Sequence, residues 1–175
     1  MVARKKAWSI EIPLIDTIID ISAVDLQQLD KKVLKLDLTR ILHGRGTEAT
    51  FVVLVKDGKA TAELKKLTLP TFYIQRAIRK GISYVEDSFK CTTNGYTLRI
   101  KPFLITRKRV HRAIRKALRI KAQEIIKEYC SSKQPSEVFS SVLYGKLQKE
   151  LSMKLKKVYP LAFCEIRVLE VLGKK

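Results

Sequence analysis

The sequence is poor in cysteine, and the cysteines it has show no metal-binding spacing. Cys91, Cys130 and Cys164 lie far apart, none belongs to a Cys-x-x-Cys pair, and each sits among apolar residues. Structural zinc sites and disulfide frameworks need cysteines at close, paired spacings. We therefore interpret all three as reduced core residues of a cytosolic protein, and we expect no metal and no cofactor.

Long apolar runs are also missing. The longest purely apolar run is Phe51 to Val55, far shorter than the roughly 20 residues that cross a bilayer as a helix. The first eight residues are basic, as at the start of a signal peptide, but Glu11, Asp16 and Asp20 interrupt the apolar segment that should follow. We expect a soluble protein without a secretion signal, whose residues 1–8 form a basic arm and whose residues 9–175 form a single domain.

A catalytic constellation is not apparent. The carboxylates are scattered, and the two histidines, His43 and His111, fall in a glycine-rich turn and inside a basic segment. Acid–base catalysis needs ionisable groups that converge on one place. The Gly44-Arg45-Gly46 turn is a weak phosphate signal, because no strand-to-helix context for a nucleotide follows it. The sequence favours a binding protein over an enzyme.

Acidic residues are absent from one long stretch, Ser88–Gln123, which carries eleven Lys or Arg of a chain with net charge +19. Such a stretch predicts a polyanionic partner, with nucleic acid as the first candidate and an acidic membrane surface as the second. The alternative is an ordinary solvated face. A solvated face would normally interleave carboxylates with its cations, so we favour the polyanionic partner.

The first half of this stretch predicts a β-hairpin around Asn94-Gly95, a dipeptide typical of a type I′ turn. That loop pairs Thr93 with Tyr96, Cys91 with Leu98, Lys90 with Arg99 and Phe89 with Ile100. One face is apolar, and the other carries Lys90, Thr92, Arg99 and Lys101. Opposed like charges destabilise a sheet unless an anion lies across them, and a phosphate would serve.

The second half predicts a helix over Lys108–Cys130. Its buried side would carry Val110, Ala113, Ile114, Ala117, Leu118, Ala122, Ile125, Ile126 and Tyr129, which recur at three and four residues. On the opposite side Lys108, Arg112, Arg115 and Arg119 form a column at spacings of four, three and four. His111, in the middle of this column, is interpreted as a neighbour of phosphate or sugar.

Aromatic residues are scarce in the same stretch. Beyond the hairpin turn only Phe103 is present, and Tyr96 falls on the apolar face of the hairpin. Proteins that read unpaired bases stack them on aromatic side chains, and this stretch offers little material for that. Recognition of the backbone and shape of folded RNA by Arg and Lys fits better.

The rest of the chain reads as alternating strands and helices. Pro13 leaves the apolar segment Ile10–Ile21 without a confident assignment, so we expect it to be irregular. Predicted strands are Val33–Leu42, Ala49–Val55 and Ala60–Leu67 around an Asp57-Gly58 turn, and Cys164–Leu172, with Ile166, Val168 and Leu172 on one side. Predicted helices are a short one from Pro70 with Phe72, Ile74, Ala77 and Ile78 inside, one capped by Ser136, and one over Lys146–Val158.

Five short motifs resemble one family in order and spacing. They are Thr-Asn-Gly-Tyr-Thr-Leu-Arg at 93–99, Leu-Ile-Thr at 104–106, Ala-Ile-Arg-Lys at 113–116, Tyr-Gly-Lys-Leu at 144–147 and Val-Tyr-Pro-Leu at 158–161. The set is similar to the small-subunit ribosomal protein family that archaea and eukaryotes share, named S-three-a-e or eukaryotic-type S-one. Because the lysine-rich start and acidic tail of eukaryotic members are missing, the chain resembles a short archaeal form.

This resemblance implies an α+β fold with a barrel-like antiparallel sheet and three to four packed helices. It implies a place on the platform of the small ribosomal subunit near the messenger-RNA exit, with ribosomal RNA, neighbouring ribosomal proteins and messenger RNA as partners, and no catalysis. Matching motifs carry over Arg99, Arg115, Lys116 and Lys146. With the cations inferred from the pattern itself, the predicted RNA-binding set is Lys90, Arg99, Lys101, Arg107, Lys108, Arg109, Arg112, Arg115, Lys116, Arg119 and Lys146.

Two alternatives stay open beside a structural ribosomal protein bound to ribosomes in the cytoplasm. One is a free-standing RNA-binding module or RNA chaperone. The other is a peripheral membrane protein, which would need bulky apolar residues beside the cations of the basic helix, whereas that helix has an unbroken core stripe instead. We therefore expect no membrane partner.

Overall fold

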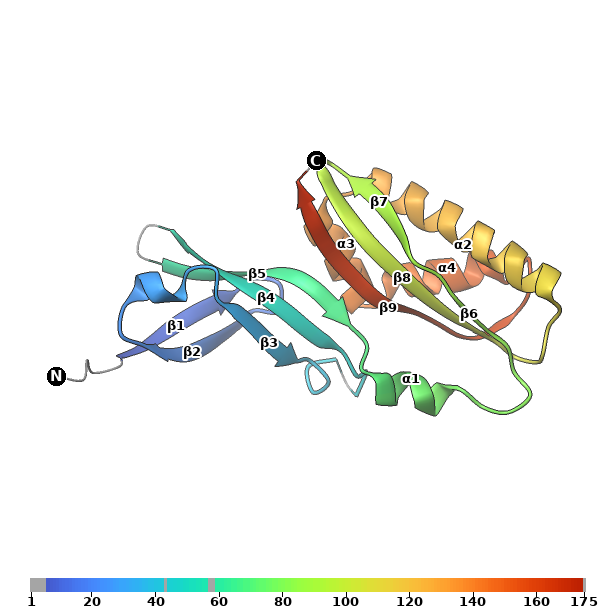
Figure 1. The fold of residues 1–175 in the computed structure, drawn as a ribbon, viewed down its shortest axis with the longest axis horizontal. Coiled ribbons are helices and arrows are strands. Elements are labelled where there is room, and N and C mark those ends of the chain that lie inside the picture. The colour runs from blue at the N-terminus through green and yellow to red at the C-terminus, as the bar shows by residue number, and fades with distance from the viewer. Residues whose placement is uncertain (1–5, 43, 57–58, 175) are drawn as a thin grey trace.

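The computed structural model describes residues 6–42, 44–56 and 59–174 (Figure 1). Its strands are β1 (Lys6–Ile12), β2 (Thr17–Ala23), β3 (Val33–Asp37), β4 (Glu48–Lys56), β5 (Lys59–Thr68), β6 (Tyr84–Glu86), β7 (Phe89–Thr93), β8 (Tyr96–Thr106) and β9 (Leu161–Lys174). Its helices are α1 (Thr71–Ala77), α2 (Arg112–Ser131), α3 (Pro135–Leu143) and α4 (Lys146–Leu155), with a short 3₁₀ helix at Leu26–Leu29. The predicted α+β class with three to four helices is confirmed.

The described strands form one open sheet in an elongated molecule, with β1 to β5 at one end and β6 to β9 at the other (Figure 1). The central path runs β2-β1-β5-β9-β8-β6, while β4 pairs with β5, β3 with β4, and β7 with β8. All pairings are antiparallel except the short parallel contact of β1 with β5. The barrel-like closure is not confirmed, because the strands at the two ends of the sheet do not meet.

The amino-terminal segment expected to be irregular is a β-hairpin. The strands β1 and β2 pair from Lys6 with Ala23 to Ile12 with Thr17. Pro13 follows the last residue of β1, so it lies in the turn, where its missing N–H removes no ladder hydrogen bond. Residues 1–5 of the predicted arm lie outside the described residues, and residues 6–8 belong to β1.

The β7–β8 hairpin has the predicted register. Phe89 pairs with Ile100, Lys90 with Arg99, Cys91 with Leu98 and Thr93 with Tyr96. The predicted turn type is wrong, because Gly95 has a φ of +81° but Asn94 has no positive φ. A type I′ turn needs positive φ at both central residues, whereas this φ pattern is that of a type II turn, in which only the second residue needs it.

Three helices cover one face of the sheet. A row of apolar residues faces them across five strands and consists of Phe89, Ile100, Leu169, Leu67 and Ala49. From the helix side, Leu118 of α2, Leu143 of α3 and Leu151 of α4 join the same core. Since neighbouring residues of a strand point to opposite faces, the adjacent row of side chains lies on the face away from α2, α3 and α4.

A bulge in β9 changes which of its residues are buried. Lys101 of β8 pairs with Val168 and Pro102 pairs with Ile166, so Arg167 is an extra residue on β9. The bulge interrupts the alternation, and the buried residues are Ile166 and Leu169 rather than the predicted Ile166, Val168 and Leu172.

The ends of the carboxyl-terminal helices differ from the predicted ones. Gln134 is the N-cap of α3 and Pro135 takes its first turn, so Ser136 is not the cap. Gly145 separates α3 from α4 with a φ of +72°, and a Cβ there would lie 3.3 Å from a guanidinium nitrogen of Arg45. Helix α4 ends at Leu155, three residues before the predicted end at Val158.

Helix α1 lies on the opposite side of the sheet from the other helices. Its buried residue Ile74 packs with Leu69, Phe103 and Ile105 in a second apolar cluster. The short helix after Pro70 is confirmed, but its predicted buried side is wrong in part, since Phe72 is 57% exposed and Ile78 is 41% exposed.

The strands around the predicted Asp57-Gly58 turn are confirmed, and the turn itself lies outside the described residues.

Candidate nucleic-acid interface

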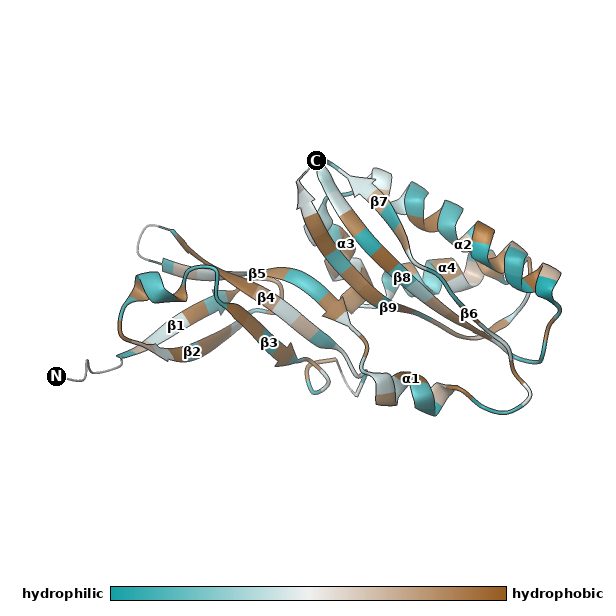
Figure 2. Cartoon of the chain, viewed as in Figure 1, coloured by the Kyte–Doolittle hydropathy of each residue, from teal (hydrophilic) through white to brown (hydrophobic). Residues whose placement is uncertain are grey.

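The basic column of α2 is an exposed ridge above a buried apolar stripe. Arg112, Arg115, Lys116 and Arg119 are all exposed, as is Lys108 just before the helix. Beneath them Leu118, Ala122, Ile125, Ile126 and Cys130 are buried against the sheet. Figure 2 shows the hydrophilic residues recurring along the helix. The predicted helix and its basic side are confirmed from Arg112 on, but the helix begins four residues after the predicted Lys108, which lies in the preceding loop. Ala113 and Ala117, predicted inside, are exposed.

These cations are not neutralised by the protein. Among the described residues, none of the carboxylates forms an ion pair with Arg112, Arg115 or Arg119. The first ion pair along α2 joins Lys121 and Glu124, at 2.9 Å. Like charges one helical turn apart repel each other. The first two turns of α2 therefore carry uncompensated charge that a polyanion would relieve.

The loop before α2 adds three exposed cations, Arg107, Lys108 and Arg109. Its shape is held by Thr106, which is fully buried and whose hydroxyl donates to the Lys108 carbonyl at 2.7 Å. At the other end of the loop, the Val110 N–H donates to the Ser83 hydroxyl at 3.2 Å. Because its backbone is fixed at both ends, the loop places these three positive charges next to the column at the start of α2.

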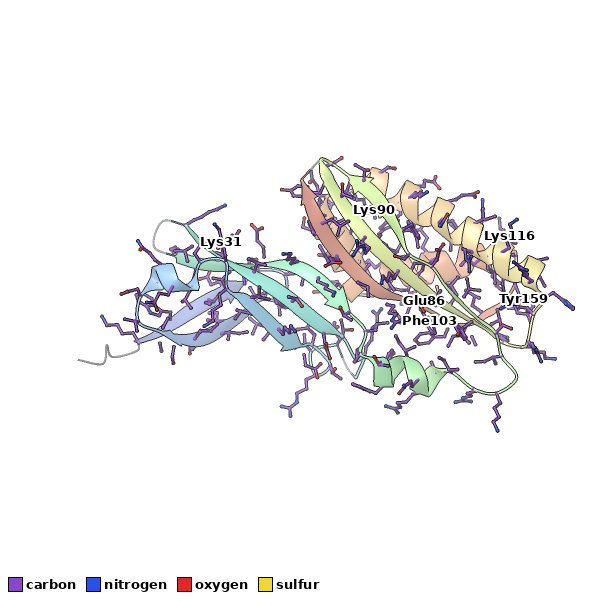
Figure 3. The ribbon with its side chains drawn as sticks, viewed as in Figure 1. Lys31, Glu86, Lys90, Phe103, Lys116 and Tyr159 are labelled. Carbon is purple, nitrogen blue, oxygen red and sulfur yellow. The ribbon has the colours of Figure 1, made fainter. Side chains whose placement is uncertain are left out.

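The sheet residues of the predicted site lie elsewhere. Cys91, Leu98 and Ile100 face α2, so Lys90, Arg99 and Lys101 lie on the opposite face of the sheet. Figure 3 shows Lys90 on the sheet and Lys116 on α2. The structure thus divides the predicted site into two basic surfaces, which one straight stretch of RNA backbone would not cover together.

The basic surface of the sheet includes one carboxylate, that of Glu170. Arg99 Nη1 lies 3.5 Å from Glu170 Oε2, and Glu170 is flanked on the other side by Lys66 of β5. The opposed charges of Lys90 and Arg99 are therefore offset in part by a carboxylate of β9, where we had expected a phosphate. The strand register extends this row of side chains to Thr50 of β4 and Lys35 of β3. Lys66 and Lys35 are absent from the predicted RNA-binding set, because the row forms only when distant strands pair.

Lys146, the last predicted residue, begins α4 and is exposed. It lies beside Gly145, at the junction of α3 and α4, and is distant in sequence from the Arg107–Arg109 loop.

His111 is the N-cap of α2, and its carbonyl accepts a hydrogen bond from the Arg115 N–H at 3.3 Å. Its exposed position beside the column is compatible with the predicted contact to phosphate or sugar, which stays a prediction.

Arg45, from the glycine-rich turn, acts inside the protein. Its guanidinium donates to the carbonyls of Val142 at 3.2 Å and Leu143 at 3.0 Å, the last turn of α3, and pairs with the Glu165 carboxylate of β9. Carbonyls at a helix end lack intrahelical partners, and a cation there satisfies them. The weak phosphate signal of this turn therefore has a structural explanation.

Two of the cysteines meet between β7 and α2. The Cys130 thiol donates a hydrogen bond to Cys91, which lowers the pKa of Cys91 and raises the pKa of Cys130, and burial raises the pKa of Cys130 further. Both are buried and free, as predicted for core residues. Burial, with the nearby charge of Glu165, raises the pKa of Cys164 from 9.0 to about 12.

Among the described residues, no three His, Cys, Asp or Glu side chains come together as metal ligands would. No described helix is long and apolar enough to span a bilayer.

Comparison with known proteins decides the family. The model of the Ribosomal S3Ae family matches residues 14–175, almost the whole chain. The chain belongs to this family. The predicted resemblance, in its archaeal form, is confirmed, because several archaeal proteins are similar to this chain.

Three relatives are each named small ribosomal subunit protein eS1. The Methanothermobacter thermautotrophicus protein is 32% identical over 120 residues, covering 66% of this chain and 62% of the relative. The Archaeoglobus fulgidus protein is 27% identical over 150 residues, covering 74% and 71%. The Pyrobaculum neutrophilum protein is 27% identical over 158 residues, covering 87% and 71%. The chain thus matches less than two thirds of the first relative and somewhat more of the other two.

Proposed function

We propose that this S3Ae-family protein is a structural constituent of the small ribosomal subunit and binds folded ribosomal RNA through the α2 column and the Arg107–Arg109 loop. The observation that carries the proposal is the column of Arg112, Arg115 and Arg119, continued by Lys108 of the preceding loop. All four are exposed and none forms an ion pair with a described carboxylate. The names of the archaeal relatives support the ribosomal setting.

The chemistry of the column suits phosphate. Arginine presents a planar fork of donors that matches two phosphate oxygens, and its charge does not depend on pH in the ordinary range. Side chains one turn apart on a straight helix follow a rising line, which a curved sugar-phosphate backbone can accompany. Contacts of this kind give affinity and position without reading the base sequence.

We further propose a non-catalytic role in the cytoplasm, bound to the platform of the subunit near the messenger-RNA exit. Its partners there would be ribosomal RNA, neighbouring ribosomal proteins and messenger RNA. The family membership supports the ribosomal partners, and the opposed basic surface of the sheet supports contact with more than one partner.

The test is a triple substitution, Arg112→Gln, Arg115→Gln and Arg119→Gln. All three side chains are exposed, so the melting temperature should stay equal or rise slightly as repulsion is relieved, while incorporation into small subunits falls sharply. Co-sedimentation with small subunits at physiological salt measures incorporation, and thermal unfolding measures stability.

A matched control removes the same charge elsewhere. Lys31 and Lys32, just before β3, and Lys56, the last residue of β4, are exposed, and both strands lie at the end of the molecule away from α2 (Figure 1). Their combined change to Gln should leave incorporation close to that of the parent. If the α2 variant assembles as well as the parent, the column is only a solvated face. If both variants lose incorporation equally, net charge and not the column is responsible.

A further inference from the structure

Aromatic side chains gather on the sheet face that α1 covers. The rings of Tyr84 and Phe103 stack at 5.9 Å between centroids, Phe103 meets Phe163 edge-on at 6.3 Å, and Phe163 lies 6.1 Å from Tyr73 of α1. Figure 3 shows Phe103 on the sheet above α1. These residues come from α1, β6, β8 and β9, so no single stretch of sequence reveals the cluster.

Tyr84 is the member of the cluster that reaches solvent. It is 54% exposed, whereas Phe103 beneath it is only 2% exposed. One side of the Tyr84 ring is supported by Phe103, with the two planes inclined by 29°. The exposure of Tyr84 leaves the outer side of the ring open, and an aromatic ring held from below is a rigid flat platform.

The backbone ties this platform to the basic loop. Ser83, the residue before Tyr84, accepts a hydrogen bond at its carbonyl from the Thr106 N–H at 2.9 Å. The Ser83 hydroxyl accepts from the Val110 N–H at 3.2 Å, and the Thr106 hydroxyl reaches the Lys108 carbonyl. The loop that carries the exposed cations Arg107, Lys108 and Arg109 is thus tied at both ends to Ser83, the residue before Tyr84.

The segment that leads into Tyr84 is also positively charged. The stretch Leu64–Val85 contains no Asp or Glu and five Lys or Arg, and Arg79 and Lys80 in it are exposed. The next carboxylate, Glu86, is paired with Arg167. An exposed aromatic ring whose neighbours in the chain and whose hydrogen-bonded loop carry cations fits a ligand that has both a flat ring and a phosphate.

We propose that Tyr84 is a stacking platform for an unpaired RNA base whose phosphates lie on the Arg107–Arg109 loop and on Arg79 and Lys80. This site would hold a looped-out or single-stranded nucleotide, because a base inside a duplex has no free face to offer. The site rests on the proposed RNA-binding function and adds to it a class of ligand that the α2 column does not select. The basic stretch itself offers little material for base stacking, and Tyr84 supplies an aromatic ring from outside that stretch.

The first test compares two RNA probes at physiological salt: a short labelled oligouridine and an RNA duplex of the same length. Tyr84→Ala should weaken binding of the oligouridine by about 5-fold to 100-fold, the range seen when a stacking aromatic is removed, and leave duplex binding nearly unchanged. Tyr84→Phe should retain the parent affinity because the flat ring stays. Tyr144→Ala is the matched control, since Tyr144 is 63% exposed at the end of α3 and belongs to no described ring cluster.

A second test reports stacking directly and does not depend on the stability of the alanine variant. The sequence has one tryptophan, Trp8, so Trp8→Phe combined with Tyr84→Trp places the only indole at the platform. Stacked bases quench indole fluorescence, so oligouridine should quench it at the concentrations at which it binds, and the duplex should not.

The outcomes separate the two proposals. Loss of oligouridine binding in Tyr84→Ala with quenching in the tryptophan variant supports the stacking site. Unchanged oligouridine binding in Tyr84→Ala, or equal quenching by duplex, overturns it and leaves the aromatic surface to a protein neighbour, while duplex binding through α2 would still stand. If the parent binds neither probe, the RNA-binding function itself fails.

Discussion

The Arg45 guanidinium lies against the Glu165 carboxylate, although 120 positions separate the two residues in the chain. The pair joins the loop before β4 to β9, and Arg45 also holds the last carbonyls of α3. Gln148 of α4 donates to the same carboxylate at 3.2 Å and to the Val142 carbonyl at 3.0 Å. One cluster of polar contacts therefore links both halves of the molecule.

Replacing Arg45 should destabilise the fold strongly. Both side chains are mostly buried, at 19% and 14% exposure, so Arg45→Met leaves the charged Glu165 carboxylate without its cation, with the hydrogen bond from Gln148 as a weaker substitute. We expect a loss of roughly 3 kcal/mol in the free energy of unfolding, measured by urea denaturation. The double change Arg45→Met and Glu165→Leu should recover part of it. A single variant within about 0.5 kcal/mol of the parent would mean that the pair is solvated.

Helix α2 offers a direct test of its register. Leu118 is fully buried and Ile120, two residues on, is 46% exposed. Leu118→Ala should cost about 2 to 5 kcal/mol, through lost burial and the cavity left behind, and Ile114→Ala, at a partly buried position, should cost less. Ile120→Ala is the control on the same helix and should change stability by less than about 0.5 kcal/mol. Equal effects at 118 and 120 would place the helix in another register.

The carboxylate inside the basic row of the sheet makes the second surface testable. Glu170→Gln removes the anion beside Arg99 and Lys66, so RNA affinity should rise several-fold if RNA phosphates lie on this face. The measurement is the dissociation constant for ribosomal RNA fragments by filter binding. Glu137→Gln, at an exposed position of α3, is the control for the change in net charge. Equal gains in both variants, or none in Glu170→Gln, would show that RNA does not use this face.

The salt dependence of RNA affinity reports how many phosphates are contacted. Roughly 6 to 10 phosphate contacts, as the column, its loop and the sheet row could supply, imply a log–log slope of about −4 to −9. The slope is measured from dissociation constants at several salt concentrations. Replacing Arg112, Arg115 and Arg119 with Gln should make this slope shallower, by about one for each phosphate contact that is lost. A parent slope shallower than about −2 would contradict an interface dominated by phosphate.

Cys164 should make stability depend on pH in the alkaline range. Its pKa is about 12 in the fold and ordinarily 9.0, so between these values the folded chain keeps a proton that the unfolded chain has lost. Unfolding then releases a proton, and stability falls as pH rises through this window. Cys164→Val removes this contribution, so its urea midpoint should fall less steeply with pH than that of the parent. Parallel curves for the two proteins would show that the thiol titrates normally.

Features that depend on residues close together in sequence were predicted well. The register of the β7–β8 hairpin follows from its two-residue loop and from alternating apolar side chains. The α2 helix and its basic side follow from spacings of three and four. The family was also recognisable, because five short motifs in order need no knowledge of how the chain packs.

Features that depend on contacts between distant segments could not be read in this way. The bulge at Arg167 shifted the buried side of β9, and the β1–β2 hairpin formed around a Pro13 that is harmless because it lies in the turn. Basic residues that share one acid-free stretch lie on two opposite faces, because the sheet passes between Arg99 and the α2 column. Likewise Tyr84 gains its support only when β6, β8 and β9 pair, which brings Phe103 beneath Tyr84 and Phe163 against Phe103. Burial against such partners depends on the pairing of whole strands.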